Sequence, residues 1–189
     1  MKSRAPKFVG DERELDLAEL GIKLWACPHC GRSGTLIGHG YLRGYAERGQ
    51  ELVVRGRRIF CSNRQRRPGC GRTLSVLVAT AISGFVVRAL TLFRFAQEVV
   101  LGLSLGAAWR AAAAGAFSVW SGYRLWRRLG AAQSALRSRL CREHGPPACA
   151  HSEPLAALLA HFRVVFPNAV SPFSEFQARL QHGLFDRSA

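Results

Sequence analysis

The stretch CSNRQRRPGCGR (residues 61–72) contains two cysteines separated by eight residues, three of which are arginines. A second cysteine pair lies upstream, in WACPHCGRSG. A C-x2-C-G knuckle lets two thiolates bind one ion, while nearby backbone N–H groups stabilise the charge on the sulfur atoms. The spacing predicts one tetrahedral site for Zn²⁺, made of Cys27, Cys30, Cys61 and Cys70. The ion is expected to be structural, because four thiolates leave no open position for a reactive water.

The segment between the two cysteine pairs predicts a β hairpin. Residues 35–45 (TLIGHGYLRGY) and 51–60 (ELVVRGRRIF) are rich in β-forming side chains, and AERGQ between them supplies the turn. A third short strand, RTLSVLV, follows at residues 72–78. Knuckle, hairpin, knuckle and strand is the order of elements in a zinc ribbon. We therefore expect a zinc ribbon over residues 25–80, preceded by an N-terminal arm over residues 1–24.

The second knuckle departs from the usual C-x2-C spacing. The residues between its cysteines, SNRQRRPG, are predicted to be an insertion that projects from the knuckle, and a longer loop costs little additional entropy. Its arginines, Arg64, Arg66 and Arg67, are placed to contact phosphates. His29, inside the first knuckle, is expected to point outward. The alternative is that the four cysteines are free or buried in a β-rich domain without metal.

The net charge of +15 is concentrated in one part of the chain. Residues 52–142 contain 16 arginines, no lysine and a single acid, Glu98, whereas the remaining residues contain 11 basic and 11 acidic side chains. Such a field attracts a polyanion, because neutralising phosphates releases counterions. A GC-rich genome also raises the arginine content, but it does not account for the loss of acids from one continuous region. The distribution predicts a nucleic-acid partner.

From residue 83 onward the hydrophobic periodicity becomes helical. A first helix is predicted at 84–101 and a short alanine-rich helix at 107–115, before a third helix that follows Ser118. Two short helices joined by a glycine-containing turn, the second rich in arginine, outline a helix-turn-helix. The expected fold class is therefore α+β, with an N-terminal β-rich zinc ribbon followed by an α-helical helix-turn-helix domain over residues 83–143.

The helix at residues 118–129 is predicted to contact DNA. With about 100° per residue, its apolar side chains fall on one arc and its polar and basic side chains on the opposite arc. The apolar arc consists of Val119, Tyr123, Leu125, Trp126 and Leu129. The predicted DNA-facing residues are Trp120, Ser121, Arg124, Arg127 and Arg128. Ser118 is expected to cap the helix. Any surface helix has a solvated charged face, but the absence of acids from residues 99–142 favours DNA.

Residues 131–143 (AAQSALRSRLCRE) predict a further helix, which adds Arg137 and Arg139 to the DNA-binding set. The stretch CREHGPPACAH has two interpretations. It is either a loop between helices or a second metal site made of Cys141, His144, Cys149 and His151. Residues 144–189 are expected to form a C-terminal extension, in which EPLAALLAHFRVVFP and PFSEFQARLQHGLF are two helices that pack back onto the core.

The motifs CPHCG, LIGHGYLRGY, CGRTLSVL and SGYRLWRRLGAAQSALRSRLC follow one another in this order. This layout, over residues 25–143, is similar to the zinc-ribbon and helix-turn-helix region of bacterial insertion-sequence transposases, and to small mobile-element proteins of the same layout. The resemblance implies that residues 118–129 form the DNA-reading helix. It also implies that the zinc ligands are Cys27, Cys30, Cys61 and Cys70. The long gap in the second knuckle departs from the family pattern.

Transposases of that kind continue into an RNase-H-like domain whose carboxylates bind two magnesium ions. Here the only aspartates are Asp11, Asp16 and Asp186, near the two ends of the chain. After residue 52 the only glutamates are Glu98, Glu143, Glu153 and Glu175. These are too few and too scattered to predict a two-metal site for phosphoryl transfer. We therefore expect that the protein is not an enzyme.

Three functions remain open from the sequence. The first is a DNA-binding accessory protein of a bacterial mobile element, which recognises an element end or target DNA and recruits a separately encoded transposase or recombinase. The others are a transcriptional regulator and a protein-interaction adaptor. Self-association as a homo-oligomer is also open. The sequence has no apolar run of about 18 residues and no secretory signal, so we expect no membrane segment and a cytoplasmic, nucleoid-associated location with reduced thiols.

Overall fold

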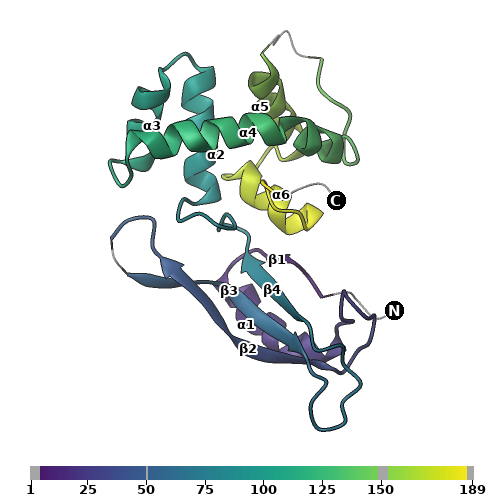
Figure 1. The fold of residues 1–189 in the computed structure, drawn as a ribbon. Coiled ribbons are helices and arrows are strands. Elements are labelled where there is room, and N and C mark those ends of the chain that lie inside the picture. The colour runs from purple at the N-terminus through teal and green to yellow at the C-terminus, as the bar shows by residue number, and fades with distance from the viewer. Residues whose placement is uncertain (1–4, 50, 149–152, 187–189) are drawn as a thin grey trace.

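The sheet and most of the helices form two halves of the molecule, one stacked on the other (Figure 1). The structure, a computed structural model, describes residues 5–49, 51–148 and 153–186. Among these residues it contains one mixed four-stranded sheet and six α-helices. This confirms the predicted α+β fold class.

The sheet contains the three predicted strands and one further strand. Its strands are β1 (Phe8–Val9), β2 (Leu36–Tyr45), β3 (Leu52–Cys61) and β4 (Thr73–Val78). Their order is β1-β4-β3-β2, in which β3 is antiparallel to both β2 and β4 and β1 is parallel to β4. A hydrogen bond of 2.7 Å from the Ala46 N–H to the Glu51 carbonyl closes the hairpin between β2 and β3. The hairpin therefore turns where the sequence predicts.

The pairing of β2 and β3 is interrupted near the hairpin turn. Leu42 pairs with Gly56 and Arg43 pairs with Val54, so Arg55 is an extra residue without a partner on β2. A β-bulge of this kind bends the strand and redirects the side chain of the extra residue. Arg55 thus points in a direction that continuous pairing does not allow.

The N-terminal segment, expected only as an arm, folds onto the sheet. Helix α1 (Glu12–Gly21) follows β1 and continues into a 3-10 turn, η1 (Ile22–Leu24). Leu15 of α1 is buried in the core of the sheet half. Arg57 of β3 is also largely buried, and its guanidinium forms a two-pronged ion pair with the Glu19 carboxylate. The sheet therefore has a helix on one face.

The helical half contains five helices. They are α2 (Ala89–Val100), α3 (Leu105–Ala113), α4 (Val119–Leu140), α5 (Pro154–Val165) and α6 (Pro172–Leu180). The prediction for the first of these was too long. Gly84 has a φ of +77°, in the left-handed region, and a backbone bridge between Ala81 and Arg88 closes the residues between them into a loop. The chain therefore becomes helical only at Ala89.

α4 is one continuous helix, where the sequence suggested two helices on either side of Gly130. A glycine inside a helix costs about 1 kcal/mol relative to alanine. Leu125 and Leu129 before this glycine, and Leu136 and Leu140 after it, are all buried on the same side. The burial of this leucine stripe outweighs the cost of one glycine, so the helix continues.

The core of the helical half is rich in aromatic rings. Phe162 of α5 packs edge-on against Phe173 and Phe176 of α6, with ring centroids 4.8 and 5.4 Å apart. Phe173 also packs edge-on against Phe93 of α2, at 5.1 Å. The two C-terminal helices therefore pack back onto the core, as predicted.

Hydrogen bonds join the two halves at several places. The Gln181 side chain, at the end of α6, accepts hydrogen bonds from the Lys7 and Phe8 N–H groups at 2.6 and 3.0 Å and donates to the Phe8 carbonyl at 3.0 Å. The side-chain amide of Gln177, in α6, donates to the carbonyls of Ala79 and Ala81 after β4, at 2.6 and 2.9 Å. At the hairpin turn, the Glu47 carboxylate accepts hydrogen bonds from the Arg88 N–H at 2.9 Å and the Thr91 hydroxyl at 2.8 Å. These contacts fix the hairpin and the end of β4 relative to α2 and α6.

Candidate metal centre and nucleic-acid interface

The four predicted cysteine ligands lie together where β2 begins and β3 ends. The Sγ atoms of Cys27 and Cys70 are 3.8 Å apart, as are those of Cys30 and Cys61, and all four lie within 4.8 Å of one another. A tetrahedral ion with metal–sulfur bonds of about 2.3 Å places its sulfur atoms about 3.8 Å apart. The four thiols can therefore bind one metal ion. Among the described residues, no other group of three or more His, Cys, Asp or Glu side chains is close enough to do so.

The two cysteine pairs have the same backbone hydrogen bonds. In the first pair, the Gly31 N–H donates to the Cys27 carbonyl at 2.8 Å, and in the second the Gly71 N–H donates to the Cys61 carbonyl at 2.9 Å. The first cysteine of each pair donates its own N–H to the carbonyl of the residue after the glycine, at 2.9 Å. The two glycines have φ values of +71° and +72°. Both pairs are thus knuckles of one geometry.

The long spacing of the second knuckle is due to residues 63–68, which project from it. The Gly69 N–H donates to the Ser62 carbonyl at 3.0 Å and closes this loop at its base. A Cβ atom added to Gly69 would lie only 2.1 Å from that carbonyl oxygen, so the position requires glycine. Without the loop the sequence reads Cys-Ser-Gly-Cys-Gly. The C-x8-C spacing is therefore a C-x2-C-G knuckle with a loop inserted after its second residue.

The Cys61 sulfur accepts hydrogen bonds that stabilise its thiolate. The Thr35 hydroxyl lies 3.2 Å from it, and the Cys70 N–H donates to it at 3.3 Å. Burial alone would raise the pKa of the Cys61 thiol, but these hydrogen bonds lower it to about 7. Burial raises the pKa of Cys27 to about 11. The role of Thr35 was not predicted, because a hydroxyl residue near a knuckle has no characteristic spacing.

The loop at residues 63–68 presents its arginines to solvent. Gln65 and Arg66 have φ values of +50° and +61°, and the Arg67 N–H donates to the Arg64 carbonyl at 3.0 Å, so the loop makes a tight turn. The Arg64 guanidinium lies over the Phe60 ring, 5.5 Å from its centroid. All three arginines of the loop are exposed.

α4 separates the two predicted faces, with one exception. Leu125 and Leu129 are buried and Trp126 is partly buried. Tyr123, expected on the buried face, is 41% exposed and lies beside Trp120, with ring centroids 5.7 Å apart. Ser121 is partly exposed, and the exposed residues of the predicted DNA-facing set are Trp120, Arg124, Arg127 and Arg128. The exposed face of α4 thus combines arginines with two aromatic rings.

α3 and α4 cross at a close contact. Gly122 of α4 faces Trp109 of α3, and a Cβ atom added to this glycine would lie 2.7 Å from the indole ring. The Trp109 Nε1–H donates to the Ser118 carbonyl at 3.0 Å. Ala114 and Gly115, with φ values of +48° and +76°, turn the chain between the helices. Ser118 occupies the N-cap position of α4, but its hydroxyl makes no cap hydrogen bond, contrary to the prediction.

Among the described residues, the arginines of the basic region form almost no ion pairs with acidic side chains. The described residues form three ion pairs, which are Lys7–Asp186, Arg57–Glu19 and Arg179–Glu143. Of the 16 arginines between residues 52 and 142, only Arg57 takes part. Arg137 and Arg139, predicted to contact DNA, are partly buried near the end of α4 and are not ion-paired within the described chain.

The second predicted metal site is only partly covered by the structure. Cys149 and His151 lie outside the described residues, whereas Cys141 and His144 follow α4 and are exposed. Nε2 of the buried His161, in α5, donates to the His144 carbonyl at 2.9 Å. In the described part of the chain, this segment therefore connects the end of α4 to α5.

No protein-family model, curated protein or solved structure matches the chain. No helix within the described ranges combines the length and the hydropathy needed to cross a membrane. The geometry of the metal centre and of the basic surface is therefore the basis for inferring a function.

Proposed function

We propose that the protein is a non-catalytic, zinc-stabilised protein that binds double-stranded DNA. The observation that carries this proposal is the exposed face of α4, where Arg124, Arg127 and Arg128 have no carboxylate partner among the described residues. Guanidinium groups on a helix can make two parallel hydrogen bonds to a guanine edge or to a phosphate in the major groove. The neighbouring Trp120 and Tyr123 rings add apolar surface on the same face.

In this proposal the sheet half is a zinc ribbon. Four thiolates at tetrahedral spacing suit Zn²⁺, and a closed coordination shell makes the ion structural. A small β domain of this kind obtains much of its folding free energy from the metal. The ion would hold the two knuckles together and thereby fix the loop at residues 63–68, whose three arginines would contact phosphates.

The pair formed by α3 and α4 is proposed to be a helix-turn-helix. The contact between Trp109 and Gly122 sets the angle between the two helices, and the buried Leu125 and Leu129 anchor α4 on its inner side. α4 would then act as the recognition helix. Recognition helices contact bases mainly through their N-terminal residues, and the exposed arginines lie in the N-terminal half of α4.

The resemblance to mobile-element proteins makes the proposal more specific. The DNA would be an element end or a target site, and the partner a separately encoded transposase or recombinase that this chain recruits. A transcriptional regulator would use the same face of α4 on a promoter. The genomic location of the bound sequence distinguishes the two roles.

The outer face of α1 favours a second candidate function, that of a protein-interaction adaptor. Leu17 and Leu20 are 59% and 84% exposed, on the side of the helix opposite the buried Leu15, and Leu24 in the following η1 turn is 73% exposed. Exposed apolar patches commonly mark contacts with other proteins. An adaptor would keep its protein partner when the arginines of α4 are removed.

Selection from a random pool of duplex DNA tests the proposed function. The zinc-loaded protein should enrich a sequence motif at physiological salt. The R124A/R127A/R128A variant should lose that motif, because base contacts specify the sequence. The control variant R64A/R66A/R67A removes the same charge from the loop and should bind more weakly but enrich the same motif. No retention of DNA by the wild type would favour the adaptor.

A further inference from the structure

A loop between the sheet and the helices, residues 82–87, forms the floor of a groove. Phe85 in this loop is held between two groups. The ring of Phe185 packs edge-on against it, with centroids 5.4 Å apart, and the Arg128 guanidinium lies 4.9 Å from its centroid. A backbone bridge closes the loop at its base. Stacking and backbone pairing therefore fix the floor in place.

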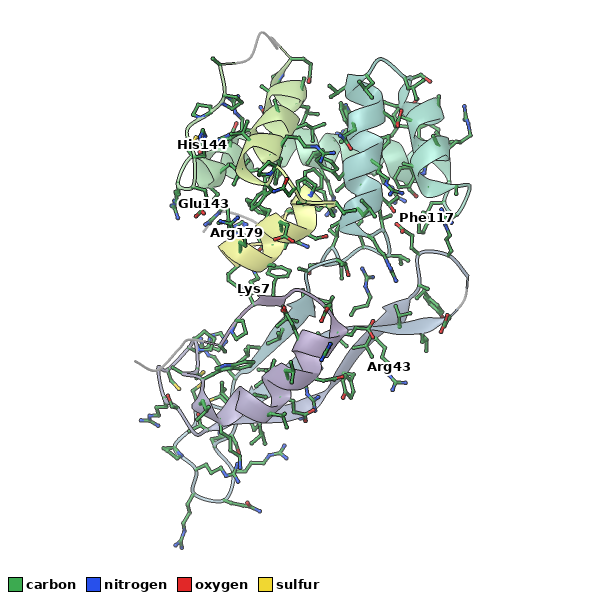
Figure 2. All side chains as sticks on the ribbon, turned by 180° about the vertical axis from the view of Figure 1, so that it is seen from behind. Lys7, Arg43, Phe117, Glu143, His144 and Arg179 are labelled. Carbon is green, nitrogen blue, oxygen red and sulfur yellow. The ribbon has the colours of Figure 1, made fainter. Side chains whose placement is uncertain are left out.

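Arginines line both walls of this groove. α4 contributes Arg124 and Arg128 to a hollow of 390 Å³, and the β hairpin contributes Arg43 and Arg55 to a hollow of 270 Å³. The two hollows share residues 84–86 and no acid lines either of them. Figure 2 shows Arg43 on the same side of the molecule as Phe117, which lines the first hollow. The two hollows therefore adjoin at the loop, one on the side of the hairpin and one on the side of α4, and together they are called the groove here.

Three features direct Arg55 toward the floor of the groove. It is the extra residue of the bulge in β3. Its side chain crosses β2 at Gly44, where an added Cβ atom would lie 2.7 Å from the arginine Cδ. Its Nη2 reaches the carbonyl of Ile82, at 3.4 Å, at the start of the loop. The guanidinium is therefore held between the hairpin and the loop.

Ion pairs do not neutralise the arginines of the groove within the described residues. Burial, together with the nearby Arg88 charge, lowers the pKa of Arg55. Glu47 acts in the opposite direction, but its carboxylate already accepts hydrogen bonds from the Arg88 N–H and the Thr91 hydroxyl. Unpaired cations on two facing walls create a strong site for a polyanion.

We propose that this groove, defined by Arg43, Arg55, Arg124 and Arg128, binds the sugar-phosphate backbone of the duplex that α4 contacts. The inference rests on the proposed DNA-binding function and adds two residues of the β hairpin that the sequence did not indicate. The guanidinium of Arg128 lies against Phe85, and a stacked guanidinium still has its edge available for a phosphate. The hairpin and α4 thus hold one DNA strand from two sides.

The test measures how the affinity of the zinc-loaded protein for a mixed-sequence duplex depends on salt. Each lost phosphate contact makes the plot of log K against log salt shallower by about 0.9. The R43A/R55A variant should therefore show a slope shallower by about 1.8 and an affinity about 30-fold lower at about 0.15 M salt. R43K/R55K keeps the charge and should restore most of the slope. The control R94A/R142A removes two exposed arginines outside the groove and should leave both quantities unchanged.

The possible outcomes separate the groove from the proposed function. R43A/R55A could keep the affinity and the salt slope of the wild type while R124A/R127A loses most of its affinity for the duplex. This result would overturn the proposed role of the groove and leave the proposed DNA binding in place. No binding by the wild type would overturn both. If R43A/R55A loses its zinc or unfolds, a second test uses the wild type. Its arginine side chains are modified with phenylglyoxal in the presence and absence of DNA. Protection of Arg43 and Arg55 by DNA supports the groove, and equal modification with and without DNA contradicts it.

Discussion

The two halves of this molecule differ in what holds them together. The buried hydrophobic cluster of the sheet half has nine residues, of which two are cysteines of the candidate metal centre and none is aromatic. The core of the helical half has 22 buried residues, seven of them aromatic. A core that small supplies little folding free energy, so we expect a bound metal to contribute in its place. We therefore expect the stability of the sheet half to depend on a bound metal, and that of the helical half to depend on the packing of its core.

Removal of the metal should have the largest effect, and it should be confined to one half. Binding of a structural zinc ion contributes about 10–16 kcal/mol at neutral pH in small zinc domains. A strong chelator, or Cys61→Ser, should therefore unfold β2, β3 and β4 and leave α2 to α6 folded. Hydrogen exchange measured by mass spectrometry shows which strands and helices lose their folded structure. Equal loss of protection from exchange in both halves would contradict the expectation that only the sheet half depends on the metal.

Phe173→Ala is the corresponding change in the helical half. Phe173 is fully buried and contacts Phe93 and Phe162, so its truncation leaves a cavity. We expect a loss of about 3–5 kcal/mol in the free energy of unfolding, measured by denaturant titration. The zinc content should stay at one ion per chain. A variant that loses its zinc as readily as Cys61→Ser would show that the halves fold as one unit.

Gly69→Ala tests the geometry of the second knuckle. The added Cβ atom would lie 2.1 Å from the Ser62 carbonyl oxygen, so the backbone next to Cys70 must shift. Changes of this kind beside a ligand typically cost about 10–100-fold in metal affinity. Competition with a chromophoric chelator gives the affinity for zinc. An unchanged affinity would contradict the assignment of this knuckle.

Gln177→Ala tests how strongly the halves are joined. Its side chain donates to the carbonyls of Ala79 and Ala81, and the amide is fully buried. Leaving buried carbonyls without donors costs about 1–3 kcal/mol each. Thermal melting should show a lower midpoint, with the transition of the sheet half separating from that of the helices. A melting curve identical to the wild type would mean that this contact does not couple the halves.

Gly130→Ala should have the smallest effect. It should stabilise the protein, whereas Gly69→Ala should weaken metal binding. An added Cβ atom at Gly130 meets no neighbouring atom, and the residue lies inside α4. Alanine should stabilise the helix by up to about 1 kcal/mol. Denaturant unfolding measures the gain. Destabilisation would argue against a continuous α4.

The parts of the fold that follow local rules could be predicted from the sequence. Alternating β-forming residues located β2, β3 and β4, and the knuckle spacing brought Cys27 and Cys30 together with Cys61 and Cys70. The leucine stripe of α4 was also visible. The continuity of α4 could not be predicted, because Gly130 is a local signal for a helix break. The helix continues only because its leucines are buried in the tertiary structure.

The groove could not be predicted, because it depends on contacts between distant segments. Arg43 and Arg55 lie in a strand pair whose bulge has no sequence signature. Their position opposite α4 results from the hydrogen bonds of Glu47 to the start of α2. Tyr123 was assigned to the buried face from its angle on the helix, but the residue is 41% exposed and its ring lies against Trp120 instead.

We infer that the unpaired arginines of α4 bind duplex DNA. The most direct measurement is fluorescence anisotropy of a labelled mixed-sequence duplex, titrated with zinc-loaded protein over a range of salt concentrations. With three phosphate contacts from α4, log K should fall against log salt with a slope of about −2.7 or steeper. R124A/R127A/R128A should give a much shallower slope. Absence of binding at low salt, or the same slope in the variant, would contradict the claim.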